Sequence, residues 1–220
     1  ILNEPTLIDE LVATANSTKR LTLECYSTSD NFLKLVATLR DRGLTIYTPE
    51  SPEADDAWTV NFFGSKGGIR QLAQQSGTLE PDFKMPDGLV VFGINDAAKI
   101  AANKYLDDKG VVIKTNKGHA GAGMYIFRPG DLPLDYPSCV AQILTSLQKD
   151  AYWSKFPIII ENYLPAVPSV GGGFPNVEFK VLKSGKVEFL YYCGMRLTPD
   201  GVFKGVEINQ DVVSDRVAAQ

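Results

Sequence analysis

Two apolar runs on either side of a glycine-rich loop constrain the fold of this chain more than any other feature. The stretch VVIKTNKGHAGAGMYIF runs from Val111 to Phe127, and its first β-branched run ends at Lys114. The apolar residues after the glycines predict a second strand, so the loop joins two antiparallel strands. No Gly-Lys-Ser/Thr opens a helix here, which excludes a P-loop, and a following strand excludes the dinucleotide-binding fingerprint.

The glycines of this loop favour contact with an anion. Glycine has no Cβ, so the backbone can approach a ligand closely and turn its amide protons inward around a negative charge. Lys114 would place an ammonium group beside the same anion. We therefore interpret the loop as a flap over phosphates, with a plain glycine-rich hairpin as the alternative. His119 lies within the loop, so we expect a phosphate contact or solvent exposure, because base catalysis needs fixed geometry.

The first third of the chain alternates strands and helices. Residues 21–26 predict a strand, Ser27 to Asp30 supply capping side chains for a helix, and residues 44–47 predict the next strand. This β-α-β order implies a right-handed crossover and a parallel sheet. Residues 58–63 predict another strand, and residues 78–88 predict a linker rich in turn residues.

The second half predicts more elements of both kinds. Asn95 or Asp96 can cap a helix that ends near Leu106, and another helix is expected near residues 140–147. A hairpin surrounds residues 183–186, and the sheet would continue through a turn at residues 199–201.

Composition limits the classes of function. The chain has 220 residues, a net charge of −4 and 44% hydrophobic residues, so it has no electrostatic case for broad nucleic-acid or membrane binding. No apolar stretch approaches the roughly 20 residues that span a bilayer. Cys25, Cys139 and Cys193 form neither a disulfide framework nor a zinc site, which favours a reducing cytoplasm. One histidine argues against His-based metal sites and catalytic triads. The oligomeric state is not indicated.

Two further segments favour a nucleotide. Lys66 opens a predicted helix, where a cation is unfavourable unless an external anion offsets the helix dipole. The run IIIENYLP ends an apolar strand at Glu161, and the backbone that follows is suited to an adenine edge, with Leu164 packed on the base.

These segments resemble, in their order, the ATP-grasp superfamily of ATP-dependent carboxylate–amine ligases. The matching pieces run from Lys66 to Leu190 and are SKGGIRQLAQQSG, NDAAKIAANKYL, VVIKTNKGHAGAGM, IIIENYLP and NVEFKVLKSGKVEFL. Their element order is similar to that of biotin-carboxylase-like members. The resemblance implies an α/β fold with an N-terminal parallel β-α-β domain (1–85), an ATP-grasp-like α+β lid (86–165) and part of the C-terminal subdomain (166–220).

The resemblance also implies roles for individual residues. Two lysines would contact the nucleotide phosphates, the loop would form the flap, and the strand end would hold adenine. Glu178 would lie near the ribose, or else face outward from its strand. The implied catalytic residues are Lys114 and Arg196, and the implied nucleotide-binding residues are Lys66, Lys114, Gly118, His119, Gly121, Gly123, Met124, Glu161, Asn162, Tyr163, Leu164 and Glu178.

The implied cofactors are ATP and Mg²⁺, and the implied substrates are a small carboxylate and an amine. One departure concerns the metal: Glu207 and Asn209 have the E-x-N spacing of the family's ligands but follow the strand end too closely, so we assign no metal ligand here. We expect a truncated chain whose metal ligands lie beyond residue 220 and which turns over poorly alone. The alternatives are a nucleotide-binding or interaction domain without ligase activity, and a small-molecule kinase on the same scaffold.

Overall fold

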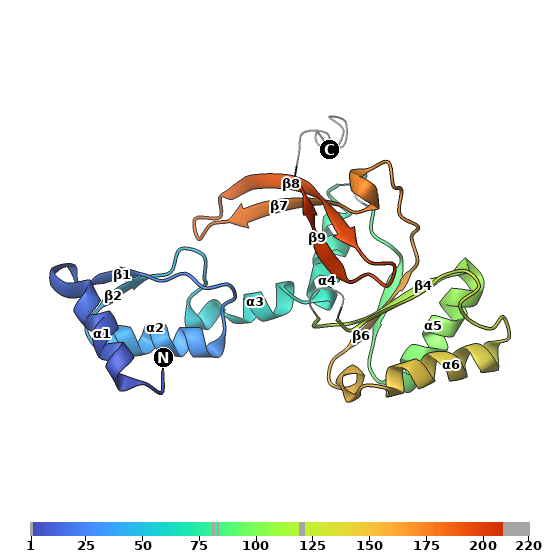
Figure 1. Ribbon diagram of the computed structural model, residues 1–220, viewed down its shortest axis with the longest axis horizontal. Helices are drawn as coiled ribbons and strands as arrows, with labels where there is room; N and C mark the ends of the chain where they lie inside the picture. Colours follow the sequence, from blue (N-terminus) through green and yellow to red (C-terminus); the bar gives the residue numbers. More distant parts are fainter. Residues whose placement is uncertain (1, 81, 83, 119–121, 209–220) are drawn as a thin grey trace. The chain divides into compact units, whose positions relative to one another are not determined.

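The computed structural model describes residues 2–80, 82, 84–118 and 122–208 (Figure 1). The chain forms two compact units, and each is described by itself. The first contains Ile1–Asn61 and Glu178–Tyr191, and the second contains Phe62–Val177 and Tyr192–Gln220. Among the described residues, no helix combines the length and the apolar character that crossing a bilayer requires.

Helices and strands alternate along much of the chain. The α-helices are α1 (Pro5–Ala15), α2 (Asp30–Asp41), α3 (Trp58–Phe63), α4 (Lys66–Ser76), α5 (Ile94–Asp108) and α6 (Tyr136–Gln148). Short 3-10 helices are η1 (Asn16–Thr18), η2 (Ala54–Asp56), η3 (Ala151–Ser154) and η4 (Gly171–Gly173). The strands are β1 (Arg20–Thr22), β2 (Thr45–Tyr47), β3 (Gly88–Val91), β4 (Val111–Thr115), β5 (Met124–Phe127), β6 (Ile158–Asn162), β7 (Pro175–Val181), β8 (Val187–Leu197) and β9 (Phe203–Glu207).

The first unit contains the predicted β-α-β segment. Ser29 caps α2 by accepting a hydrogen bond from the Phe32 amide at 3.2 Å. Strands β1 and β2 pair in parallel, with Leu21 opposite Ile46. Buried residues of α1, α2 and β2 form its core, which comprises Ile8, Ala15, Val36, Leu39, Leu44 and Ile46. The parallel arrangement that the sequence predicts is confirmed.

A carboxylate of the first unit accepts charged hydrogen bonds from two side chains. Glu53 accepts from Arg40 at 2.8 Å and from Lys183 at 2.9 Å. These bonds, the one from Arg40 first, lower the pKa of Glu53 from 4.5 to about 2. The ionised carboxylate therefore contributes stability that is present above pH 4.5 and is lost as the pH falls through about 2. The pair is half-exposed, so this contribution is below about 1 kcal/mol.

We expect a carboxyl-carbon NMR titration of Glu53 to show this low midpoint. The Arg40→Met variant removes the stronger donor, so its midpoint should move up toward the ordinary value of 4.5. A wild-type midpoint already near 4.5 would show that the ion pair does not persist in solution.

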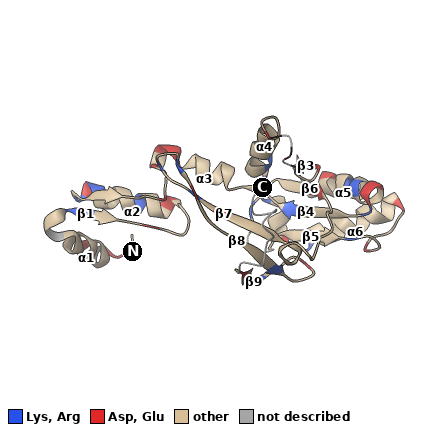
Figure 2. Ribbon diagram, turned by 90° about the horizontal axis from the view of Figure 1, so that it is seen from above, with Lys and Arg blue, Asp and Glu red and all other residues tan. Residues whose placement is uncertain are grey.

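The second unit is organised around a four-stranded sheet in the order β3-β6-β4-β5. Helices α5 and α6 pack against one face of this sheet (Figure 1). Val111 and Ile113 of β4 and Ile158 and Ile160 of β6 point into that core. Because strand side chains alternate between faces, the residues between them point to the opposite face. Charges of both signs lie on α5, as they do on α2 (Figure 2).

Helix α5 approaches the core closely through small side chains and anchors a loop through a tyrosine. Ala97, Ala98, Ala101 and Ala102 are all fully buried. The Tyr105 hydroxyl accepts hydrogen bonds from the amides of Gly130 and Leu132, both at 3.0 Å. Tyr105 thereby satisfies two backbone donors between β5 and α6.

The Tyr105→Phe variant is expected to lower the free energy of unfolding by about 1 to 3 kcal/mol, because it leaves these donors without an acceptor. Tyr136→Phe, at an exposed position on α6, serves as the control and should change stability little. Urea denaturation monitored by circular dichroism measures both. An unchanged midpoint for Tyr105→Phe would contradict the assigned bonds.

Strands β7, β8 and β9 form a three-stranded sheet in that order. The predicted hairpin turn at residues 199–201 is confirmed, since Val202 donates its amide to the Thr198 hydroxyl at 2.9 Å and β8 and β9 pair in antiparallel fashion.

Two local predictions are wrong. Residues 58–63 form helix α3 instead of a strand, with the Thr59 hydroxyl donating to the Asp56 carbonyl at 2.6 Å in its first turn. Aromatic and β-branched residues favour strands only where a neighbouring strand can pair with them. Helix α5 begins after Gly93, which has a positive φ, so Asn95 and Asp96 lie inside its first turn. Among the described residues of the expected linker, 78–88, only Gly88 lies in a strand, where it begins β3.

Candidate functional site

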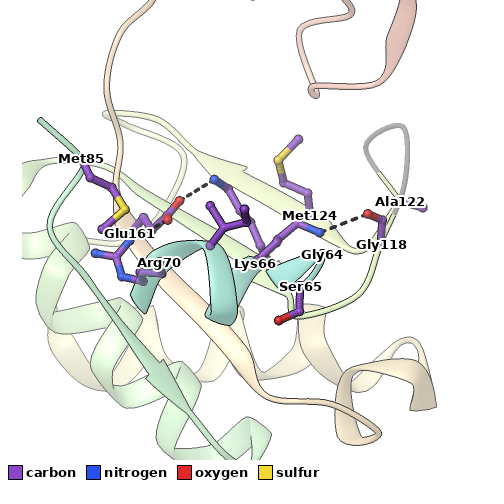
Figure 3. Close-up of a pocket in the computed structure, with 11 residues that line it drawn as sticks. Gly64, Ser65, Lys66, Arg70, Met85, Gly118, Ala122, Met124 and Glu161 are labelled. Atoms are coloured by element: carbon purple, nitrogen blue, oxygen red, sulfur yellow. Dashed lines mark hydrogen bonds and ion pairs between the residues drawn. The ribbon is translucent and has the colours of Figure 1, made fainter. Parts of the chain in front are cut away.

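The start of α4 is fixed by a serine cap. The Ser65 hydroxyl accepts from the Gly68 amide at 3.0 Å and donates to the Phe62 carbonyl at 2.7 Å. Lys66 is therefore the first residue of the helix, as the sequence predicts, and its Nζ donates to the Gly118 carbonyl at 3.1 Å (Figure 3). Lys66 thus links this helix to the glycine loop.

Asn116 joins the same helix to the end of β4. The amide of Lys66 donates to the Asn116 carbonyl at 3.1 Å, and the amide of Gly67 donates to Asn116 Oδ1 at 2.7 Å. The first amides of a helix have no partner within it, so Asn116 satisfies two donors that would otherwise be free. These bonds fix the position of the start of α4 relative to the end of β4.

The sheet register brings the second predicted lysine to the same place. Lys114 lies opposite Met124 of β5, and Glu161 of β6 lies opposite Val112, two residues from Lys114. Side chains related in this diagonal way on one face are within reach of each other. Lys114 and Glu161 form an ion pair on the face that α5 and α6 leave open.

A charged cavity of about 460 Å³ opens over this face (Figure 3). We define it by its lining residues, which are Gly64, Ser65, Lys66, Ile69, Arg70, Met85, Lys114, Gly118, Ala122, Met124 and Glu161. Three cationic side chains and one carboxylate leave a surplus of two positive charges. Such a surplus in a partly enclosed site suits an anion with several negative charges, such as a polyphosphate.

The two lysines influence each other electrostatically. Burial lowers the pKa of the Lys66 ammonium, the positive charge of Lys114 lowers it further, and the carboxylate of Glu161 partly raises it again. An anion bound between the two lysines would remove their repulsion. Lys66 and Lys114 line one cavity, as the sequence predicts. Their contact with phosphate stays a prediction.

An apolar cavity of about 390 Å³ adjoins the charged one, with Lys114 and Met124 lining both. Its other lining residues are Val112, Ile126, Arg128, Tyr163, Leu164, Ala166, Phe174, Leu197, Thr198, Pro199 and Gly201. A ligand with a flat apolar part and a charged tail fits this pair of cavities.

The ends of the loop require glycine. Gly123 has φ +70°, and a Cβ there would lie 2.2 Å from Cγ2 of the buried Thr115. A Cβ at Gly118 would lie 2.3 Å from the Ala122 carbonyl oxygen. His119 and Gly121 lie outside the described residues, so their predicted roles stay predictions.

The other predicted site residues are distributed as follows. Asn162 faces α5, where Lys104 donates to its Oδ1 at 2.7 Å. Tyr163 and Leu164 line the apolar cavity. Glu178 belongs to the first unit. Arg196 is ion-paired with Glu207 and donates to the Gly171 carbonyl at 3.2 Å.

The described residues contain no acidic cluster for a magnesium ion. Within residues 2–80, 82, 84–118 and 122–208, no group of three or more His, Cys, Asp or Glu side chains is placed to hold a metal ion. Glu207 is engaged by Arg196, and Asn209 lies outside the described residues. Mg²⁺ prefers an octahedron of oxygen ligands, in which one or two carboxylates are commonly joined by substrate phosphates.

Sequence reasoning missed Arg70, although a signal for it was present. Arg70 follows Lys66 by one helical turn, so the two lie on one face of α4. Arg70 donates to Glu161 Oε1 and to the Pro86 carbonyl, both at 2.7 Å. Residues of the apolar cavity from the β8–β9 turn, such as Thr198, had no such signal, because only the folded chain brings them near β5.

Solved structures with a similar fold are known. N5-carboxyaminoimidazole synthetase from Staphylococcus aureus, complexed with ADP, matches 96% of this chain and 46% of its own, with a TM-score of 0.55 and 13% identity. An ADP complex of purK, N5-carboxyaminoimidazole ribonucleotide synthetase, matches 90% of this chain and 42% of its own, with a TM-score of 0.51 and 12% identity. Both are ATP-grasp proteins. The chain has the ATP-grasp fold.

This chain spans less than half the length of either matched structure. No protein-family model matches its sequence, and a search of curated proteins gives no significant match. At identities this low the likeness establishes the ATP-grasp fold alone. The chemistry depends on the residues of this chain.

Proposed function

We propose that this chain binds ATP as the nucleotide-binding portion of a ligase that activates a carboxylate. The observation that carries the proposal is the pair of adjoining cavities, one with Lys66 and Lys114 and one lined mostly by apolar residues, which meet at Lys114 and Met124. The triphosphate would lie in the charged cavity and the adenine in the apolar one. Both matched structures contain ADP, which supports the choice of ligand.

The proposed reaction has two steps. A carboxylate oxygen attacks the γ-phosphorus of ATP, the bond to the β–γ bridging oxygen breaks, and ADP leaves. An amine then attacks the carbonyl carbon of the acyl phosphate, inorganic phosphate leaves, and an amide forms. The protein's part is to position the phosphates and neutralise their charge, which Lys66, Lys114 and the loop amides would do. The use of a small carboxylate and an amine as substrates, the three-part division at residues 85 and 165, and a cytoplasmic location belong to the same proposal.

A second candidate is a nucleotide-binding domain without ligase activity. The observation that favours it is the absence, within the described part of the chain, of an acidic cluster able to hold Mg²⁺. This candidate shares the ATP site and differs only in turnover.

Isothermal titration tests the shared step. ATP and ADP should bind the chain, and adenosine, which has no phosphates, should bind at least about tenfold more weakly, because each charge-assisted bond to phosphate contributes roughly 1.5 kcal/mol or more. Equal affinities for adenosine and ATP, or no binding of ATP, would overturn the proposal.

Phosphate release then separates the candidates. This chain and the full translation product of its gene are assayed with ATP and a panel of carboxylates and amines. Release that requires both a carboxylate and an amine supports the ligase and excludes a kinase. ATP binding without carboxylate-dependent release in either protein supports the binding domain.

A further inference from the structure

The carboxylate in the charged cavity is paired with two cations that differ in exposure. Oε1 of Glu161 accepts from Arg70 Nη1 at 2.7 Å, and Oε2 is paired with the Lys114 ammonium. Both carboxylate oxygens therefore have a cationic partner, and the positive charge of Lys114 is compensated by Glu161.

Arg70 is the fixed partner of this pair. Its side chain is 5% exposed, against 28% for Lys114. Its Nη2 donates to the Pro86 carbonyl at 2.7 Å, and Gly88 leaves so little room that a Cβ there would lie 2.9 Å from that nitrogen. Lys114 is the more accessible cation, and it reaches into both cavities.

Removing one partner from a buried ion pair leaves an uncompensated charge, which is strongly unfavourable. If Glu161, whose side chain is 12% exposed, depended on Lys114 alone, an incoming phosphate would have to strip the carboxylate of its only cation. With Arg70 in place the carboxylate keeps one charged partner when Lys114 turns away. The cost of exchanging Lys114 from carboxylate to phosphate is thereby reduced.

We propose that Arg70 is a positioning residue that holds Glu161 as the resident counter-ion of Lys114, so that Lys114 can be exchanged between Glu161 and the phosphates of the ligand. This inference rests on the proposed function, because it assumes that phosphates enter the charged cavity. It goes further in assigning a role to a residue that need not touch the ligand.

A double-mutant cycle on the full chain tests the inference. The variants are Arg70→Met, Glu161→Gln and the double variant, and the probes are ATP and inorganic tripolyphosphate, both titrated calorimetrically. Glu161→Gln should raise tripolyphosphate affinity about tenfold, because Lys114 no longer has a competing carboxylate, and Arg70→Met should lower it about tenfold. The double variant should bind within about twofold of Glu161→Gln, since Arg70 acts only through Glu161.

Rescue separates this role from a structural one. A purely structural defect of Arg70→Met would persist in the double variant, and so would the loss of a direct bond from Arg70 to phosphate; either result overturns the inference. Thermal unfolding monitors folding, and if Arg70→Met fails to fold, Arg70→Lys takes its place in the same cycle. Asp108→Asn, an exposed charge change on α5, is the control and should leave affinity unchanged.

The proposed function and the role of Arg70 would be overturned by different results. If the wild-type chain binds neither ATP nor tripolyphosphate, the proposed function and this inference are both overturned. If it binds them but the two substitutions act independently, only the role of Arg70 is overturned.

Discussion

Lys114→Met is expected to weaken ATP binding by between about tenfold and about a hundredfold, because a charge-assisted hydrogen bond to phosphate contributes roughly 1.5 to 3 kcal/mol. Lys114 lines both the charged and the apolar cavity, so it lies where the phosphates and the base of a nucleotide would join. The substitution keeps most of the side-chain length and removes only the charge. Glu161 retains its bond from Arg70, so the fold should survive.

Titration calorimetry measures this effect, with thermal unfolding as the check on folding. Lys99→Met is the matched control, since Lys99 is an exposed lysine of α5 in the same unit. It should leave the dissociation constant within about twofold of wild type, because exposed charges at a distance are screened. Equal affinities for Lys114→Met and wild type would show that the phosphates do not enter the charged cavity.

Gly68→Ala should destabilise the second unit by about 3 kcal/mol, although Ala normally favours a helix over Gly by up to about 1 kcal/mol. A Cβ at Gly68 would lie 1.9 Å from the Phe62 carbonyl oxygen, the atom that also accepts from the Ser65 hydroxyl. A backbone atom cannot move aside as a flexible side chain can. The substitution should therefore displace the start of α4 and, with it, Lys66.

Gly77→Ala, one residue beyond the end of α4, is the control. The nearest atoms to a Cβ there are carbonyl oxygens at 3.6 Å, an ordinary contact, and its backbone is already helical. It should be neutral or stabilising by up to about 1 kcal/mol. Urea denaturation of both variants measures the difference. Similar midpoints for the two variants would show that Gly68 does not lie against the Phe62 carbonyl.

Much of this fold follows from local sequence patterns. Ser29 and the helical spacing after it predict α2, and the apolar runs around the glycine loop predict β4 and β5 as an antiparallel pair. The α/β class is confirmed. These features depend on residues close together in the chain, where capping and periodicity determine the structure.

The features that the sequence mispredicts or misses depend on contacts that a local pattern does not show. Residues 58–63 have the composition of a strand, but the turn of η2 before them and the Thr59 hydroxyl start a helix. The role of Arg70 depends on Glu161, far along the chain, and on the Pro86 carbonyl. Helical spacing from Lys66 would have placed Arg70 on the correct face, but it could not have named its partner.

Strand β6 determines how slowly the backbone under the site exchanges its amide hydrogens. It lies between β3 and β4, and its residues Ile158, Ile159 and Ile160 are all 0% exposed. Amides in such a position exchange their hydrogens with water only when the surrounding unit unfolds as a whole. Glu161 and Asn162 end that strand, so they stand on backbone that should keep its deuterium label for as long as the unit stays folded.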